Sequence, residues 1–249
     1  MFAEHLPRLA AVMRSTWKPA LQGLEPIRAP EGEPADVLGH AISERLVWNR
    51  SPLSSPASPL LGATQLVHAG ASPTVVAELD SLAQRQAPEN TDNAARAAVL
   101  IGLLDRACRT GSALAEPWYD PLMAATTLHE VLAAVPDAWV ADVRAVTGLS
   151  GPALASPSGP VIPGPTFTGS VAVGGADADV IIGTTMVEIK ATGTADLRLR
   201  DAQQVIGYAL LDFDDIYTLS RAALLSARYG RLVTWDLVDG LVGEDPPQP

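Results

Sequence analysis

Acidic residues and a lysine are closely spaced between Asp177 and Lys190. Asp179 stands just before a short apolar run, and Glu188 and Lys190 stand at the end of a second run. Carboxylate oxygens bind hard divalent cations such as Mg²⁺, and an ammonium group stabilises negative charge that develops on a nearby oxygen. If the fold brings them together, these groups are suited to the hydrolysis of a phosphate ester.

A β-hairpin is the element expected to position these side chains. The apolar runs 180–182 and 186–189 are strand-like, and Gly183-Thr184 suits a two-residue type II′ turn with glycine first. This register places Asp179 opposite Glu188, and Glu188 shares a face of its strand with the lysine two positions later. Because directly opposed like charges destabilise a sheet, a bound cation is one reason to keep the two carboxylates together.

The pattern resembles the PD-(D/E)xK nuclease superfamily, whose signature is an Asp, a short hairpin and then Glu-x-Lys. The matching residues are Asp179, Glu188 and Lys190, and the proline of the family name is absent. A second match follows, since Gln204 and Tyr208 reproduce the Gln-x-x-x-Tyr helix of the RecB-like branch. A spacing of four places both side chains on one face of a helix.

The resemblance covers residues 166–238 and implies a restriction-endonuclease-like fold that cleaves nucleic acid with Mg²⁺ or Mn²⁺. It implies that Asp179, Glu188 and the backbone carbonyl of Ile189 are the metal ligands. It also implies that Lys190 orients the attacking water or holds a phosphate oxygen. DNA is the expected substrate, and a setting in repair or anti-phage defence is an analogy at the level of the fold.

Two alternatives remain open for the hairpin. Asp177 is a rival for the first carboxylate, because the same register places it opposite Lys190. Asp179 is preferred since it begins the apolar strand, as the family's Asp does, and Asp177 then pairs with Lys190 or supports the site. Alternatively, Asp179, Glu188 and Lys190 form an ordinary salt-bridged polar face without a metal.

Helical residues are expected to complete the site. By the resemblance, Gln204 and Tyr208 line the metal site or touch the substrate, whereas the alternative is a polar helix face turned to water. Glu44, on a helix opened by Pro34, is the candidate for the acidic residue that an early helix adds to the family's metal site. His40 lies one turn before it, so both can point the same way. The alternative for Glu44 is a solvated position on an amphipathic helix.

Basic residues near the site are few. The natural phosphate contacts are Arg198, Arg200, Arg221, Arg228 and Arg231. The alternative for the last two is that they merely flank a turn at Gly230. The formal net charge of −11 argues against a protein that coats nucleic acid non-specifically, because such binding depends on Lys and Arg. A partner protein that supplies basic surface is therefore expected, and an oligomer is compatible with the sequence.

The composition predicts a globular protein in the cytoplasm. Of the 249 residues, 47% are hydrophobic and 18% are charged, which allows a sizeable core. The single cysteine, Cys108, cannot form an internal disulfide, and the N-terminus lacks the pattern of a secretion signal. The most apolar helical segment, 94–104, is too short and too charged to span a bilayer, so no membrane partner is expected.

The order of predicted elements indicates an α/β protein. Residues 1–150 are expected to form a helical region packing on the core, and the Gly/Pro/Ser-rich segment 151–165 a linker. Residues 166–240 are expected to form the nuclease-like core, with strands at 166–173, 179–182, 185–191, 222–228 and 232–237 and a helix at 199–213. Residues 241–249 are expected to be a flexible tail.

The alternative function is a non-catalytic scaffold or regulator that retains the nuclease fold and acts through protein partners. The acidic charge favours this alternative. The complete set of site residues disfavours it, because an inactive copy has no physical need for opposed carboxylates.

Overall fold

The computed structural model describes residues 7–51, 57–85, 91–110 and 116–237, so the predicted tail at 241–249 lies outside the described residues. The chain is an α/β protein with a helical N-terminal half followed by a five-stranded mixed sheet. It divides into two compact units. The helical unit is Ile27–Gly151, and the sheet unit combines Met1–Pro26 with Pro152–Pro249.

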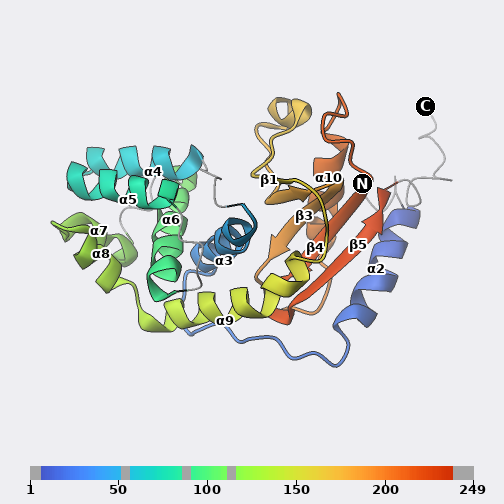
Figure 1. The fold of residues 1–249 in the computed structure, drawn as a ribbon, viewed down its shortest axis with the longest axis horizontal. Helices are drawn as coiled ribbons and strands as arrows, with labels where there is room; N and C mark the ends of the chain where they lie inside the picture. The colour runs from blue at the N-terminus through green and yellow to red at the C-terminus, as the bar shows by residue number, and fades with distance from the viewer. Residues whose placement is uncertain (1–6, 52–56, 86–90, 111–115, 238–249) are drawn as a thin grey trace. The chain divides into compact units, whose positions relative to one another are not determined.

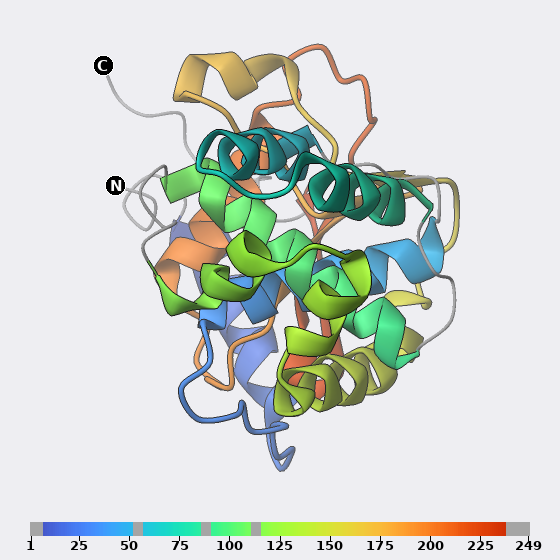
Figure 2. The same cartoon turned by 90° about the vertical axis from the view of Figure 1, so that its left-hand side faces the viewer.

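Small residues allow close helix packing in the helical unit. Its helices are α3 (Ala35–Arg50), α4 (Ala57–His68), α5 (Pro73–Arg85), α6 (Asp92–Thr110), η2 (Pro117–Tyr119), α7 (Asp120–Ala124), α8 (Leu128–Ala134) and most of α9 (Asp137–Leu154). A Cβ on Gly62 would lie 1.8 Å from the carbonyl oxygen of Leu104, so α4 rests directly on the backbone of α6. Figure 2 shows α4 and α5 together, with α6 beside them.

The five strands have the order β1-β2-β3-β4-β5: β1 (Val161–Pro163), β2 (Val180–Ile182), β3 (Thr185–Lys190), β4 (Arg221–Ser226) and β5 (Arg231–Asp236). Neighbours are antiparallel except for β3 and β4, which are parallel and joined through α10 (Leu199–Leu210). The predicted hairpin register is confirmed, since Ile182 pairs with Thr185. Gly183 has φ +60°, as the first central residue of a type II′ turn requires.

Two sequence predictions at the start of the sheet were wrong. The predicted linker, 151–165, contains the end of α9 and the strand β1, in which Val161 pairs with Ile182. The predicted strand at 166–173 is instead largely the 3₁₀ helix η3 (Thr168–Val173). Ser170 Oγ accepts a hydrogen bond from the Phe167 N–H at 3.0 Å and donates to the Ala176 carbonyl at 2.6 Å. Such local bonds compete with strand pairing.

The first helix, α2 (Pro7–Leu21), belongs to the sheet unit rather than to a helical region of 1–150. Trp17 stacks on Trp235 of β5 with ring centroids 6.4 Å apart, and its indole N–H donates to the Ala195 carbonyl at 2.9 Å. The Trp235 indole donates to Thr16 Oγ1 at 2.6 Å. A sequence boundary near residue 150 misses these contacts because they join segments about two hundred positions apart.

One apolar core unites α2, α10 and one face of the sheet. It includes Met13, Trp17, Ile181, Met186, Val205, Ile206, Leu224 and Trp235. Because cross-strand partners share a face, Asp179, Glu188 and Lys190 lie on this same face, at the end where β3 stops. The core therefore holds α10 against the part of the sheet that carries the predicted site. Among the helices in the described ranges, none has both the length and the apolar character that crossing a bilayer requires.

Candidate functional site

The hairpin brings two carboxylates to the end of β3. Asp179 Oδ2 accepts a hydrogen bond from the Ile189 N–H at 2.6 Å, which holds the aspartate against the strand that carries Glu188. Glu188 is only 5% exposed. Burial raises the pKa of Glu188 to about 8, and the negative charge of Asp179 contributes further, against the opposing effect of Lys190. The negative charge of Asp177 contributes less to the raised pKa of Glu188, and the choice of Asp179 as the first carboxylate stays a prediction.

A chain of hydrogen bonds joins β3 to α10. Lys190 Nζ donates to Glu188 Oε1 at 2.8 Å and to Gln204 Oε1 at 2.7 Å. Gln204 Nε2 in turn donates to Tyr208 Oη at 2.7 Å. The structure brings these four side chains together, and their roles in catalysis and metal binding stay predictions. Burial lowers the pKa of Lys190, but the carboxylates of Glu188, Asp179 and Asp201 outweigh it and the pKa is raised, so the amine is held as ammonium.

The amphipathic pattern of α10 explains why its polar residues face the site. Ala202, Val205 and Ile206 are buried in the core, which leaves Gln204 and Tyr208 on the flank of the helix next to Lys190. Phe167 stacks on Tyr208 with ring centroids 6.0 Å apart. Burial raises the pKa of the Tyr208 hydroxyl, which keeps it protonated and able to donate a hydrogen bond.

Arg228 and Tyr229, which follow β4, bind the loop that follows Lys190. Arg228 Nε donates to the Ala191 carbonyl at 2.6 Å, and Tyr229 Oη donates to the Gly193 carbonyl at 2.9 Å. Arg228 is buried, so the prediction that it contacts phosphate is corrected: its guanidinium anchors the chain directly after Lys190. Sequence reasoning missed these supports, and no local signal marks them because their acceptors are backbone carbonyls of another segment.

The other predicted arginines occupy different positions. Arg231 is exposed and pairs with Ser226, which pairs with Lys190, so it lies at the same strand end about 10 Å away across two strand spacings. Arg198 and Arg200 are exposed at the start of α10. Arg221 pairs with Thr185 at the opposite end of β3 and forms an ion pair with Asp236, so it is remote from the site.

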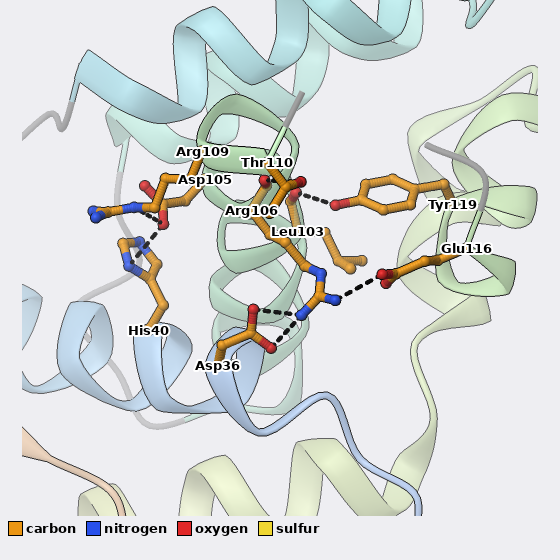
Figure 3. A network of polar contacts seen from close by, with 9 residues as sticks. All are labelled: Asp36, His40, Leu103, Asp105, Arg106, Arg109, Thr110, Glu116 and Tyr119. Atoms are coloured by element: carbon orange, nitrogen blue, oxygen red, sulfur yellow. Dashed lines mark hydrogen bonds and ion pairs between the residues drawn. The ribbon is translucent and has the colours of Figure 1, made fainter. Parts of the chain in front are cut away.

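Glu44 belongs to the helical unit, on α3. Its Oε1 lies 3.7 Å from His40 Nε2, so the two side chains point the same way, as predicted. His40 Nδ1 lies 3.6 Å from Asp105 of α6, which is in turn paired with Arg109 (Figure 3). The same figure shows Arg106 paired with Asp36 and Glu116. The ion pair between Arg106 and Asp36 ties α6 to α3, and the addition of Glu44 to a metal site in the sheet unit stays a prediction.

The donor set at the site fits a divalent cation in one respect. Glu188 Oε2 is buried and has no hydrogen-bond partner, although a buried carboxylate oxygen ordinarily has one. Within the described ranges, however, no cluster of three or more His, Cys, Asp or Glu side chains is arranged to hold a metal. A cation bound there would therefore rely on the two carboxylates, a backbone carbonyl and water, as Mg²⁺ sites commonly do.

One further signal in the sequence points to Lys190. The chain contains two lysines, Lys18 and Lys190, against fifteen arginines. At the site the basic residue is thus one of the two lysines in a chain that mostly uses arginine. Its ammonium donates to both Glu188 Oε1 and Gln204 Oε1.

Comparison with known proteins gave no match for this chain. No family model matches it, and no match was found among the curated proteins or among the solved structures.

Proposed function

We propose that the sheet unit is a metal-dependent nuclease of the PD-(D/E)xK type, with a restriction-endonuclease-like core, that hydrolyses phosphodiester bonds in nucleic acid, with DNA as the first substrate to test. The observation that carries the proposal is the hydrogen-bonded chain from Glu188 through Lys190 and Gln204 to Tyr208. Its four members come from two separate sequence motifs, Glu-x-Lys and Gln-x-x-x-Tyr.

Each side chain of the site has its own role in the proposed reaction. Asp179, Glu188 and the carbonyl of Ile189 would hold Mg²⁺ or Mn²⁺, which when bound supplies positive charge and Lewis acidity at the scissile phosphate. Lys190 Nζ has one N–H left after its bonds to Glu188 and Gln204, and this N–H would bind a phosphate oxygen or the attacking water. Its positive charge would stabilise the negative charge that develops in the transition state. Gln204 and Tyr208 fix the direction of that ammonium.

The raised pKa of Glu188 would make cation binding depend on pH. A carboxyl group with a pKa of about 8 is largely protonated at neutral pH, and it must lose this proton to act as a ligand. Cation binding would therefore release a proton and strengthen as the pH rises from 6 to 8.

The second candidate is a non-catalytic scaffold with the same fold. The net charge of −11 and the burial of Arg228 favour it, because both reduce the basic surface available to nucleic acid. Calorimetry with Mn²⁺ separates the candidates. The nuclease binds Mn²⁺ and loses most of this affinity in Glu188→Ala, whereas the scaffold shows no binding that depends on Glu188.

Cleavage of labelled single- and double-stranded DNA and RNA, with Mg²⁺ or Mn²⁺, tests the proposal directly. We expect Lys190→Ala to lower the rate by about a hundredfold or more, the usual loss when a group that stabilises transition-state charge is removed. The matched control is Lys18→Ala, which removes the chain's other lysine from an exposed position on α2. Equal activity in wild type and Lys190→Ala, or no activity on any substrate, would refute the assignment.

A further inference from the structure

An exposed apolar patch lies on the sheet unit, on two segments far apart in sequence. The most exposed large apolar side chains in the described part of the chain are Val171 (88%), Phe213 (64%), Ile216 (64%) and Val173 (58%). The first and last belong to η3, and the other two to the loop 211–220 that follows α10. Exposed apolar side chains that gather in one place are typical of surfaces that bind another molecule.

The two segments are packed against each other. The Gly169 N–H donates to the Leu211 carbonyl at 2.8 Å, and a Cβ on Gly169 would lie 2.7 Å from the ring of Phe213. Figures 1 and 2 both show η3, in gold, beside the orange-red loop. The two segments that carry the four exposed side chains therefore lie side by side.

Hydrogen bonds hold the loop in the shape that exposes Phe213 and Ile216. Asp212 accepts from the N–H groups of Ile216 and Tyr217, each at 3.0 Å. Tyr217 Oη donates to the Thr166 carbonyl at 2.8 Å. A binding surface that is already ordered loses less conformational entropy when its partner docks.

The negative charge beside the patch limits which kinds of molecule can bind there. Segments 166–176 and 210–220 together contain three aspartates, Asp212, Asp214 and Asp215, and no Lys, Arg or His. Asp214 and Asp215 stand directly between Phe213 and Ile216 and are exposed. Nucleic acid and anionic lipid would be repelled, and so would a second copy of a chain with a net charge of −11.

We propose that this patch docks a partner protein through a segment that combines apolar side chains with Lys or Arg. The apolar side chains of the partner cover Val171 and Phe213, and its cations face Asp214 and Asp215. The proposal goes beyond the nuclease assignment and does not depend on it, because it concerns residues that the proposed reaction does not use and is tested by binding alone.

A library of random twelve-residue peptides displayed on phage, selected on the full-length chain, tests the proposal. Selected peptides are synthesised with a fluorophore and titrated by anisotropy. We expect them to combine Lys or Arg with aliphatic or aromatic residues, and to bind more weakly as salt is raised. Val171→Ser with Ile216→Ser should weaken binding at least tenfold, and Asp214→Asn with Asp215→Asn several-fold. The matched control, Leu149→Ser with Glu78→Gln, changes exposed residues of the helical unit and should leave binding unchanged.

Other outcomes overturn the proposal. Selection of no peptide family, or of peptides that bind the Val171→Ser, Ile216→Ser variant as well as wild type, shows that the patch docks no such segment. Neutral or acidic peptides contradict the role of the aspartates. Sedimentation that shows a dimer in wild type and a monomer in this variant assigns the patch to self-association. Loss of DNA binding in this variant, measured by gel shift, assigns it to nucleic acid.

Discussion

Glu188 is a buried carboxyl group with a raised pKa, and it is also a proposed metal ligand. Its folded pKa of about 8 lies above the ordinary glutamate value near 4.5. The folded state therefore binds more protons than the unfolded state between these two pH values. Stability contributed by the protonated form is complete below about pH 4.5 and is lost as the pH rises through about 8.

Glu188→Gln should remove this pH dependence, because the amide keeps the shape of the protonated acid and cannot ionise. Urea unfolding at pH 5 to 9 in EDTA should show wild type losing stability across the range and Glu188→Gln losing less. Glu78→Gln, at an exposed position on α5, is the control. Parallel curves for wild type and Glu188→Gln would show that the raised pKa does not operate in solution.

Gln204 connects the ammonium of Lys190 to Tyr208 through hydrogen bonds. Removal of the Gln204 amide should therefore lower the catalytic rate more than the affinity for the substrate. Gln204→Leu should lower kcat by about tenfold or more with little change in KM, since a hydrogen bond to a charged group is worth about 1.5–3 kcal/mol. Tyr208→Phe should cost less, because Lys190 keeps both of its acceptors. Steady-state cleavage rates of the two variants check the order. A Tyr208→Phe loss larger than that of Gln204→Leu would instead place the tyrosine hydroxyl on the substrate.

The β2–β3 hairpin is the element on which the site depends. Gly183 has φ +60°, and a Cβ there would lie 2.6 Å from the carbonyl oxygen of Ser158. Gly183→Ala should therefore destabilise the protein by more than about 1 kcal/mol, through both backbone strain and the clash. It should also weaken Mn²⁺ binding, because a shifted register separates Asp179 from Glu188.

Denaturant unfolding and calorimetry measure the two effects of Gly183→Ala. Gly193→Ala is the matched control, since it has an ordinary φ and nothing within 4 Å of its Cβ position. Unchanged stability in Gly183→Ala would mean that the turn tolerates another conformation.

At the scale of the whole molecule, the two units predict different behaviour for two fragments. The helical unit is one continuous segment with its own core, so residues 27–151 should fold alone. A fragment that begins at residue 164 should not fold, because it lacks both β1 and the α2 helix whose Trp17 stacks on Trp235. Circular dichroism on heating should show a cooperative transition for the first fragment and none for the second. Cooperative melting of both would contradict the packing role of α2.

The sequence by itself determined the local geometry of the site. A Gly-Thr turn between two apolar runs sets the hairpin register, and the alternation of a strand places Glu188 and Lys190 on one face. Spacing of four places Gln204 and Tyr208 together on a helix. These features depend on neighbours in the chain, so they could be predicted from residue types alone.

Only the tertiary structure decided which distant segments complete these elements. The Gly/Pro-rich segment 151–165 contains β1, in which Val161 pairs with Ile182 of β2. Helix α2 belongs to the sheet unit, and its Trp17 stacks on Trp235 of β5. Arg228 is buried and donates a hydrogen bond to the carbonyl of Ala191, 37 positions away in the sequence. Each outcome depends on a long-range contact whose partner no local pattern identifies, and on apolar surface that is buried only when the sheet is assembled.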